Sequence, residues 1–396
     1  MKEQKKIMII GAGILQVPAI KKAKELGLYV FALDMNPSAP GFKLADESIQ
    51  LSTIDVENAV QKASKIRPHA VMTLASDMPI RTVAAIGEKC GLNTISIETA
   101  FNATNKGKMR KHLKQKNVPI PRFFVVSSLE EYVEASNNFE NKFIVKPADN
   151  SGSRGIFLVE QKSDIIEAFQ YAKKHSRSGE ILLEEYMEGP EVSVEALTIN
   201  GMTHVIAITD KLTTGAPHFV EMGHSIPSQL SVDIQQEIIN VTVSAIEAIG
   251  IDIGPSHTEI IVTKDGPKIV ELGARLGGDN ITTHLVPLAT GIDMVECTIR
   301  LALGEDVVIP KKNYKGAAIR YLKSSQGILK SIDYLEEAKN INGVKEIIII
   351  KNIGERITDI NNSNDRIGYV ITQTESAKKA IDICEKAVNL ININVL

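Results

Sequence analysis

Two glutamates, Glu259 and Glu271, flank a turn-forming stretch in GPSHTEIIVTKDGPKIVELGARLGGD, residues 254–279. A three-residue loop at 264–266, with its glycine in the left-handed conformation, would join two antiparallel strands and place Glu259 directly opposite Glu271. Two like charges facing each other destabilise a sheet, and a cation between them removes the conflict. Mg²⁺ binds one or two carboxylates together with phosphate oxygens and water. The pair therefore predicts a site for Mg²⁺, with Mn²⁺ as an alternative, and a phosphate-bearing ligand.

The same hairpin carries other groups that suit an anion. In this register His257 and Arg275 share the face of the two glutamates, and Gly277 and Gly278 allow close approach to the backbone. A guanidinium beside accessible amides can bind a phosphate or an acyl phosphate. The alternative is a solvated face on which each glutamate lies near a lysine.

A second candidate for anion binding is the segment KFIVKPADNSGSRG, residues 142–155. Pro147 prevents a helix, so Lys146 is expected at the end of a strand. The following loop offers hydroxyls, amides and flexible backbone from Ser151, Gly152, Ser153 and Gly155. A P-loop would place its lysine after the second glycine and before a helix, whereas here the lysine comes first and a strand follows at 156–160. The segment predicts a strand, an anion-binding loop and a strand, with a solvated hairpin as the alternative.

The elements that must position these groups begin with a βαβ unit. Apolar runs predict a parallel sheet over roughly the first hundred residues, with strands at 6–11, 28–33, 70–73 and 93–96 and helices at 17–26 and 80–90. Asp34 stands where a nicotinamide fingerprint has its acidic residue, but Gln16 occupies the third glycine position. An NAD(P)-dependent oxidoreductase is therefore an alternative, and we favour a purely structural turn.

The pattern of residues changes near residue 100, where a second unit is expected to begin. A basic helix is expected at 105–117, and strands at 181–185 and from 192 onward are separated by a break at Gly189-Pro190. After residue 310 a smaller α+β unit is expected, with strands at 317–321, 346–351 and 366–372 and a helix at 376–390.

Composition limits the choice of partners and compartment. Lys and Arg number 45 against 48 Asp and Glu, so no charge excess favours nucleic acid or an anionic membrane. The three cysteines lie far apart without a CxxC pair, which disfavours a disulfide framework or a zinc site. The N-terminal apolar run is too short for a signal peptide. We expect a cytoplasmic protein.

Taken in order, these pieces resemble the ATP-grasp superfamily over about residues 5–310. The resemblance implies a mixed α/β and α+β fold in which ATP and Mg²⁺ lie between two subdomains. It implies a Rossmann-like pre-ATP-grasp domain at 1–100, an ATP-grasp domain at 101–310 with a lid subdomain at about 117–187, and a small C-terminal α+β domain at 311–396.

The resemblance also implies roles for individual residues. The phosphates would be bound by the loop Ser151–Gly155 with Lys106 and Lys146, and the adenosine by Glu184, Tyr186, Met187 and Glu191. Metal binding would fall to Glu259 and Glu271, and catalysis to Arg275 and Lys146. Candidates on the substrate side are His257, His218, Glu221, His224, Gly277 and Gly278.

Within the superfamily, the motifs HTE at 257–259 and ELGARLGG at 271–278 are most similar to carboxylate-amine ligases, particularly L-amino-acid ligases. Such an enzyme would activate a carboxylate as an acyl phosphate and couple it to an amine. Many relatives carry Asn, usually a metal ligand, where Gly273 stands. The alternatives are a carboxylase that activates bicarbonate, like biotin carboxylase or the purine-pathway enzymes, and a non-catalytic nucleotide-binding protein. Small-molecule substrates are expected, and relatives are often homodimers.

Overall fold

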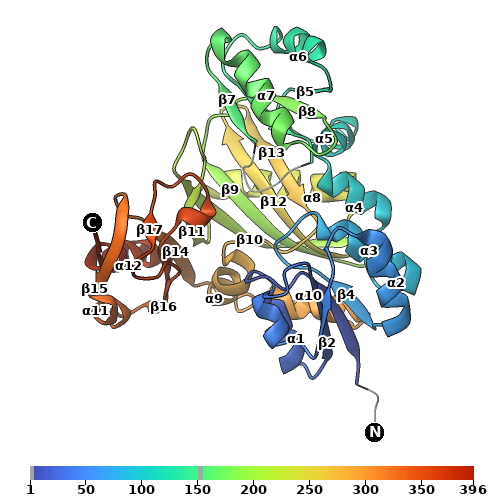
Figure 1. Cartoon of the computed structure of the whole chain (residues 1–396), viewed down its shortest axis with the longest axis vertical. Coiled ribbons are helices and arrows are strands. Elements are labelled where there is room, and N and C mark those ends of the chain that lie inside the picture. Colours follow the sequence, from blue (N-terminus) through green and yellow to red (C-terminus); the bar gives the residue numbers. More distant parts are fainter. Residues whose placement is uncertain (1–3, 150–154) are drawn as a thin grey trace.

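A computed structural model describes residues 4–149 and 155–396. Within these residues the strands form a sheet of eight, two sheets of four and a sheet of three. In Figure 1 the long sheet runs through the middle of the molecule, with the N-terminal sheet below it and the unit that contains α6 and α7 above it. No helix in the described parts of the chain is long and apolar enough to cross a bilayer.

The N-terminal sheet is parallel with the strand order β3-β2-β1-β4. Its alternating strands and helices, and the helices that lead out of it, are β1 (Lys6–Ile10), α1 (Val17–Glu25), β2 (Tyr29–Asp34), η1 (Pro40–Lys43), β3 (Glu47–Gln50), α2 (Val56–Ile66), β4 (Ala70–Met72), α3 (Pro79–Cys90), α4 (Ile97–Thr104) and α5 (Lys106–Gln115). The strand predicted at 93–96 is wrong, because this segment leads directly into α4 with Ser96 as its N-cap. The Ser96 side chain accepts the backbone N–H of Thr99, which begins the helix there.

The upper unit is an antiparallel sheet in the order β5-β8-β6-β7, covered by two helices. Its elements are β5 (Phe123–Val126), α6 (Leu129–Ser136), β6 (Phe143–Pro147), β7 (Phe157–Val159), η2 (Lys162–Asp164), α7 (Ile165–His175) and β8 (Ile181–Glu185). Phe143 and Val145 point into its core, so the intervening and following residues, Ile144 and Lys146, face the other side of the sheet.

The central sheet has the order β13-β12-β9-β10-β11-β14-β18-β16. The elements of its first part are β9 (Glu191–Ile199), β10 (Met202–Thr213), β11 (Glu221–Ile226), α8 (Val232–Ile249), β12 (Gly254–Thr263), β13 (Gly266–Gly273), η3 (Ile281–Leu285), α9 (Val286–Thr290) and α10 (Met294–Ala302). After residue 310 the central sheet continues with β14 (Gly316–Leu322), β16 (Val344–Ile349) and β18 (Gly368–Thr374). The sheet of three contains β15 (Gly327–Asp333), β17 (Arg356–Ile357) and β19 (Asn392–Val395), and the helices of this part are α11 (Leu335–Lys339), η4 (Ser363–Asp365) and α12 (Ala377–Leu390). β11 pairs with β14, so the C-terminal strands extend the sheet of the preceding unit.

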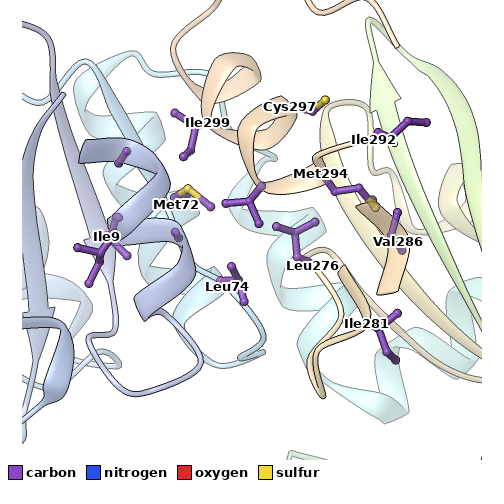
Figure 2. Packing of buried hydrophobic residues seen from close by; sticks show 14 of the residues in the cluster. Ile9, Met72, Leu74, Leu276, Ile281, Val286, Ile292, Met294, Cys297 and Ile299 are labelled. Atoms are coloured by element: carbon purple, nitrogen blue, oxygen red, sulfur yellow. The ribbon is translucent and has the colours of Figure 1, made fainter. Parts of the chain in front are cut away.

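One buried apolar cluster joins the N-terminal sheet to the central sheet. It contains Ile9 and Met72 on one side and Leu276, Met294 and Ile299 on the other, and Figure 2 shows these side chains meeting between the two layers. α10 packs against both α1 and β4. Burial of each such side chain is worth about 1.5–3 kcal/mol, so the cluster stabilises the contact between the two layers. This contact keeps the carboxyl ends of the N-terminal strands beside the β12–β13 hairpin.

Candidate active site

The two glutamates of the hairpin lie opposite each other. In the β12–β13 ladder Glu259 pairs with Glu271 and His257 pairs with Gly273. Directly opposed residues share one face of a sheet. The predicted juxtaposition of the two carboxylates is therefore confirmed at the level of strand register.

The turn that joins these strands differs from the prediction. Thr263 pairs with Gly266 across a two-residue loop, which alone would put the glutamates on opposite faces. The ladder then skips Val270, which forms a β-bulge. Because of the bulge, Ile269 and Leu272, three residues apart, both reach the same core cluster. The extra residue predicted in the turn lies instead within the strand.

Both carboxylates have cationic neighbours. Lys106 Nζ donates to Glu271 Oε1 at 2.6 Å, and Glu259 Oε1 lies 3.2 Å from Lys211 Nζ and 3.5 Å from His257 Nε2. Burial alone would raise the pKa of Glu259, but the charges of Lys211 and His257 outweigh it and hold this pKa well below its usual range. Glu259 is thus ionised at neutral pH, as a metal ligand must be.

The donor set fits Mg²⁺ or Mn²⁺ bound together with phosphate. Among the residues that the structure describes, no group of three or more His, Cys, Asp or Glu side chains could hold a metal ion by itself. Glu259 and Glu271 would therefore supply two oxygens, and a nucleotide and water would supply the rest.

Two lysines predicted to contact phosphate lie in the same region. Lys106 begins α5, where the side chain of Asn105 caps the helix, and its backbone N–H donates to the carbonyl of Ala148. Lys146 is buried and pairs with Glu184. Burial and the positive charges of Arg110 and Lys106 lower the pKa of Lys146, whereas the negative charge of Glu184 raises it. The net effect is a lowered pKa.

Glu184 is held from two sides. Arg110 Nε donates to it at 2.6 Å, and Lys146 contacts its other oxygen. Arg110 also donates to the carbonyl of Val270, the bulged residue beside the metal pair, at 2.7 Å. Sequence reasoning missed Arg110, whose place in a basic helix gave no sign that it is buried.

Lys211 on β10 is a further cation that the sequence analysis missed. Three carboxylates surround its buried Nζ: it contacts Glu191, lies 3.2 Å from Glu259 and lies 3.6 Å from Glu221. Burial would lower its pKa, but these three charges raise it well above the usual value. The pairing of β9 with β10, two strands adjacent in the chain, is a signal that could have revealed it.

The segment between β8 and β9 forms a separate pocket. Tyr186 and Met187 line a cavity of about 1300 Å³ together with Lys142, whose Nζ lies 4.5 Å from the centroid of the Tyr186 ring. Gly189 touches the neighbouring β12: a Cβ at this position would lie 1.9 Å from the carbonyl oxygen of Val262. Only glycine therefore lets this segment pass so close to β12.

His257 forms a buried pair with Glu195. Its Nδ1 lies 2.6 Å from Glu195 Oε1, and Glu195 has no solvent exposure. Burial would lower the pKa of His257, but Glu195 outweighs it and raises this pKa to about 9. Gly277 packs on this pair, since a Cβ there would lie 2.7 Å from His257 Nδ1 and 2.8 Å from Glu195 Oε2.

Arg275 reaches back to the N-terminal domain. Its Nε donates at 2.7 Å to Oδ1 of Asp77, which lies in the loop between β4 and α3. Asp77 also fills the space over Gly273, where a Cβ would lie 2.9 Å from Asp77 Oδ1. A side chain at 273 would therefore require the Asp77 carboxylate to shift. The rule that ligand sites form at the carboxyl ends of parallel strands could have drawn attention to Asp77.

The C-terminal strands approach the same region. Arg366 binds Asp279 through two hydrogen bonds of 2.7 and 2.9 Å and lies over the ring of Tyr321. His224 Nε2 lies 3.6 Å from Asp279. His218 is exposed and precedes β11. It is not among the described residues that line the cavity around Glu259 and Glu271.

One cavity of about 570 Å³ gathers nine of the predicted site residues. Those lining it are Lys106, Lys146, Glu221, His224, His257, Glu259, Glu271, Arg275 and Gly278. Glu184 contacts Lys146 and Gly277 packs on His257, whereas Glu191 contacts Lys211, which also lines the cavity. Ser151, Gly152 and Ser153 lie outside the described residues. Gly155 is described, and its φ of +82° suits glycine.

The glycine turn after β1 is filled by the protein itself. The side chain of Gln16 occupies the space that a Cβ on Gly11 or Gly13 would enter, and it donates to the Leu74 carbonyl at 2.6 Å. Asp34 accepts the backbone N–H of Ala12 rather than facing a ribose. These contacts favour the structural interpretation of the turn over a nicotinamide site.

Comparison with known proteins identifies two domains. Residues 139–283 match the ATP-grasp domain, and residues 320–395 match the L-amino acid ligase C-terminal domain 2. The chain therefore contains an ATP-grasp domain, followed by a C-terminal domain that matches the L-amino acid ligase type.

Individual relatives indicate which kinds of ATP-grasp protein the chain resembles. A phosphoribosylamine–glycine ligase of Methanocaldococcus jannaschii is 29% identical over 69% of this chain and 67% of the relative. An alanine–anticapsin ligase of Bacillus subtilis is 25% identical over 65% of this chain and 58% of the relative. The crystal structure of an L-amino acid ligase from Bacillus licheniformis has the same fold, with a TM-score of 0.83, 23% identity and full coverage of both chains. The chain is thus similar to ATP-grasp carboxylate-amine ligases in sequence and fold.

Proposed function

We propose that the protein is an ATP-dependent ligase that joins the carboxylate of one amino acid to the amine of a second small molecule, releasing ADP and phosphate. The observation that carries this proposal is that one cavity brings the opposed pair Glu259 and Glu271 together with Lys106, Lys146 and Arg275. The names of two relatives supply the substrate class, since one describes ligation of alanine and the other ligation of glycine.

The first step would be phosphoryl transfer. A carboxylate oxygen of the substrate attacks the γ-phosphorus of ATP, the bond to the β–γ bridging oxygen breaks, and ADP leaves with that electron pair. Lys106, Lys146 and Lys211 would offset the charge that spreads over the phosphate oxygens. Mg²⁺ or Mn²⁺ held by Glu259 and Glu271 would add further charge neutralisation when bound.

The second step would form the new bond. The amine nitrogen attacks the acyl carbon, the bond from that carbon to the phosphate oxygen breaks, and inorganic phosphate leaves while the amine loses a proton. Negative charge develops on the acyl oxygen during this attack. Arg275 and the cationic His257 would stabilise it.

The remaining site assignments form part of this proposal. Glu184, Tyr186, Met187 and Glu191 would bind the adenosine between the unit at about 117–187 and the rest of the ATP-grasp domain. Glu184 would then exchange part of its present contact with Lys146 for the base. The protein would act in the cytoplasm, as a monomer or a homodimer.

The test is phosphate release from ATP and Mg²⁺ with pairwise mixtures of amino acids and small amines, followed by mass spectrometry of the products. We expect a product whose mass equals the two substrates minus water. Release stimulated by bicarbonate alone would favour the carboxylase alternative, and ATP binding without release in any mixture would favour a non-catalytic protein.

The Glu271→Gln variant tests the metal assignment. It keeps the shape of the side chain but removes its charge, and we expect phosphate release to fall at least about hundredfold. The matched control is Glu375→Gln, an exposed glutamate paired with Lys379 far from the cavity, which should leave release unchanged. Near-normal turnover in Glu271→Gln would remove the metal assignment.

A further inference from the structure

Large apolar side chains are exposed on the wall that the N-terminal domain contributes to the central cavity. Leu15 follows β1, Met35 follows β2 and Ile54 follows β3, and their exposed fractions are 44%, 67% and 46%. All three line the 570 Å³ cavity. Exposed apolar groups gathered at a concave site mark a place where a ligand is bound.

The neighbouring residues show that this exposure is built into the loops. Gln16 is buried directly after Leu15, and its amide donates to the Leu74 carbonyl and to Ser76 Oγ, which ties the first loop to the one that follows β4. Asp34, directly before Met35, accepts the backbone N–H groups of Ala12 and Asn36. The polar side chains are thus turned into the protein and the apolar ones toward the cavity, which reverses the usual arrangement.

The apolar wall is continuous with the groups that would do the chemistry. Asp77 follows Ser76 in the same tied loops and pairs with Arg275 at 2.7 Å. Polar side chains also line the cavity, among them Glu221, His224 and Asp279. The cavity therefore offers an apolar surface together with charged and polar groups.

We propose that one of the two molecules joined by this enzyme carries a large apolar side chain, like that of leucine, methionine or phenylalanine, and that this side chain packs on Leu15, Met35 and Ile54. Its charged end would lie at Asp77 and Arg275. This inference rests on the proposed function and names the substrate class of the same site.

Substrate preference tests it first. With wild-type protein, a large apolar amino acid in one of the two substrate positions should give a kcat/KM at least about tenfold above that of glycine in the same position. Calorimetry with leucine and with glycine, in the presence of a non-hydrolysable ATP analogue, should show the same order of affinity. Tighter leucine binding without phosphate release would support the apolar site and contradict the ligase. Release that favours glycine or charged amino acids in both positions would support the ligase and overturn the apolar site.

The double variant Met35→Asn/Ile54→Asn locates the preference. Both side chains are exposed, so the fold should persist, and we expect the leucine-to-glycine ratio to fall at least fivefold while the KM for ATP stays unchanged. Met202→Asn is the matched control, since Met202 is 65% exposed and lies outside the described lining of the cavity. An unchanged ratio in the double variant, or an equal fall in Met202→Asn, would overturn the assignment.

Discussion

At the scale of single residues, Gly277 supports the buried pair of His257 and Glu195. Replacement by alanine would bring a Cβ to within 2.7 Å of the His257 ring nitrogen. Overpacking of this kind costs about 1–3 kcal/mol. If displacement of His257 raises the reaction barrier by this amount, the rate of phosphate release in Gly277→Ala falls about 5- to 150-fold, measured at saturating ATP.

The adjacent glycine provides the control for this prediction. At Gly278 a Cβ would meet only the Ala75 Cβ, at 3.6 Å, which is an ordinary contact. Gly278→Ala should therefore leave the pair of His257 and Glu195 in place, so its loss of phosphate release should be smaller than that of Gly277→Ala. Equal losses in both variants would show that the effect does not pass through His257.

Glu184 gives a prediction about pH. Burial would raise its pKa, but Arg110 and Lys146 outweigh it and lower this pKa to about 2. The ionised carboxylate therefore stabilises the fold above about pH 4.5, and this contribution is lost as the pH falls toward about 2. In denaturant unfolding, Glu184→Gln should lower the free energy of unfolding by about 3–5 kcal/mol at pH 7, and the gap to the wild type should narrow at pH 3.5. A gap of constant size between these pH values would contradict the ion-pair account.

Among these residues, the sequence allowed prediction of those that stand in local motifs. Glu259 and Glu271 were found because their strands adjoin in sequence and a short turn sets their register. Lys211 and Asp77 were missed because they reach the site through contacts between elements far apart in the chain. Such contacts depend on how sheets pack, which no local pattern encodes.

At the scale of elements, the segment between β8 and β9 depends on Gly189. Its φ of +148° is unfavourable for other residues, and a Cβ would overlap the Val262 carbonyl oxygen. Gly189→Ala should push this segment away from β12, weaken ATP binding through the displaced Tyr186 and Met187, and lower the denaturation midpoint. Gly201→Ala is the control, because its φ is +77° and no atom lies within 4 Å of its Cβ position. A nucleotide titration of both variants would contradict the prediction if their affinities were equal.

The prediction that the two glutamates face each other across a hairpin was confirmed, but the predicted length of the turn was wrong. The two strands and the facing glutamates were predicted, but the turn has two residues and Val270 forms a bulge. A longer turn and a bulge in the strand both add one residue between the two glutamates, so either one brings them onto the same face. The sequence pattern therefore predicts the facing glutamates better than it predicts where the extra residue lies. The core decides between them, because Ile269 and Leu272 must both be buried.

At the scale of the whole molecule, the sequence predicted the order of the units but not the way they join. The parallel N-terminal sheet follows from its alternating strands and helices. The junction of β11 with β14 could not be predicted, because the two strands are separated by a long stretch of chain and share no local pattern. The same holds for the contact of Arg366 with Asp279, which brings the C-terminal domain to the edge of the cavity.

The cluster that joins the N-terminal and central sheets allows a test at this scale. Leu276 is fully buried in this cluster and directly follows Arg275. Leu276→Ala should lower the free energy of unfolding by about 2–5 kcal/mol. It should also loosen the junction that holds Asp77 against Arg275, so turnover should be reduced even at temperatures far below the midpoint of unfolding. Leu329→Ala removes an equally buried leucine from the C-terminal cluster. It should lower the midpoint by a similar amount while leaving turnover at low temperature intact, because Leu329 does not support the junction. Thermal unfolding and phosphate release measured on both variants separate general destabilisation from loss of domain alignment, and equal turnover in the two would show that the apolar junction does not position the active site.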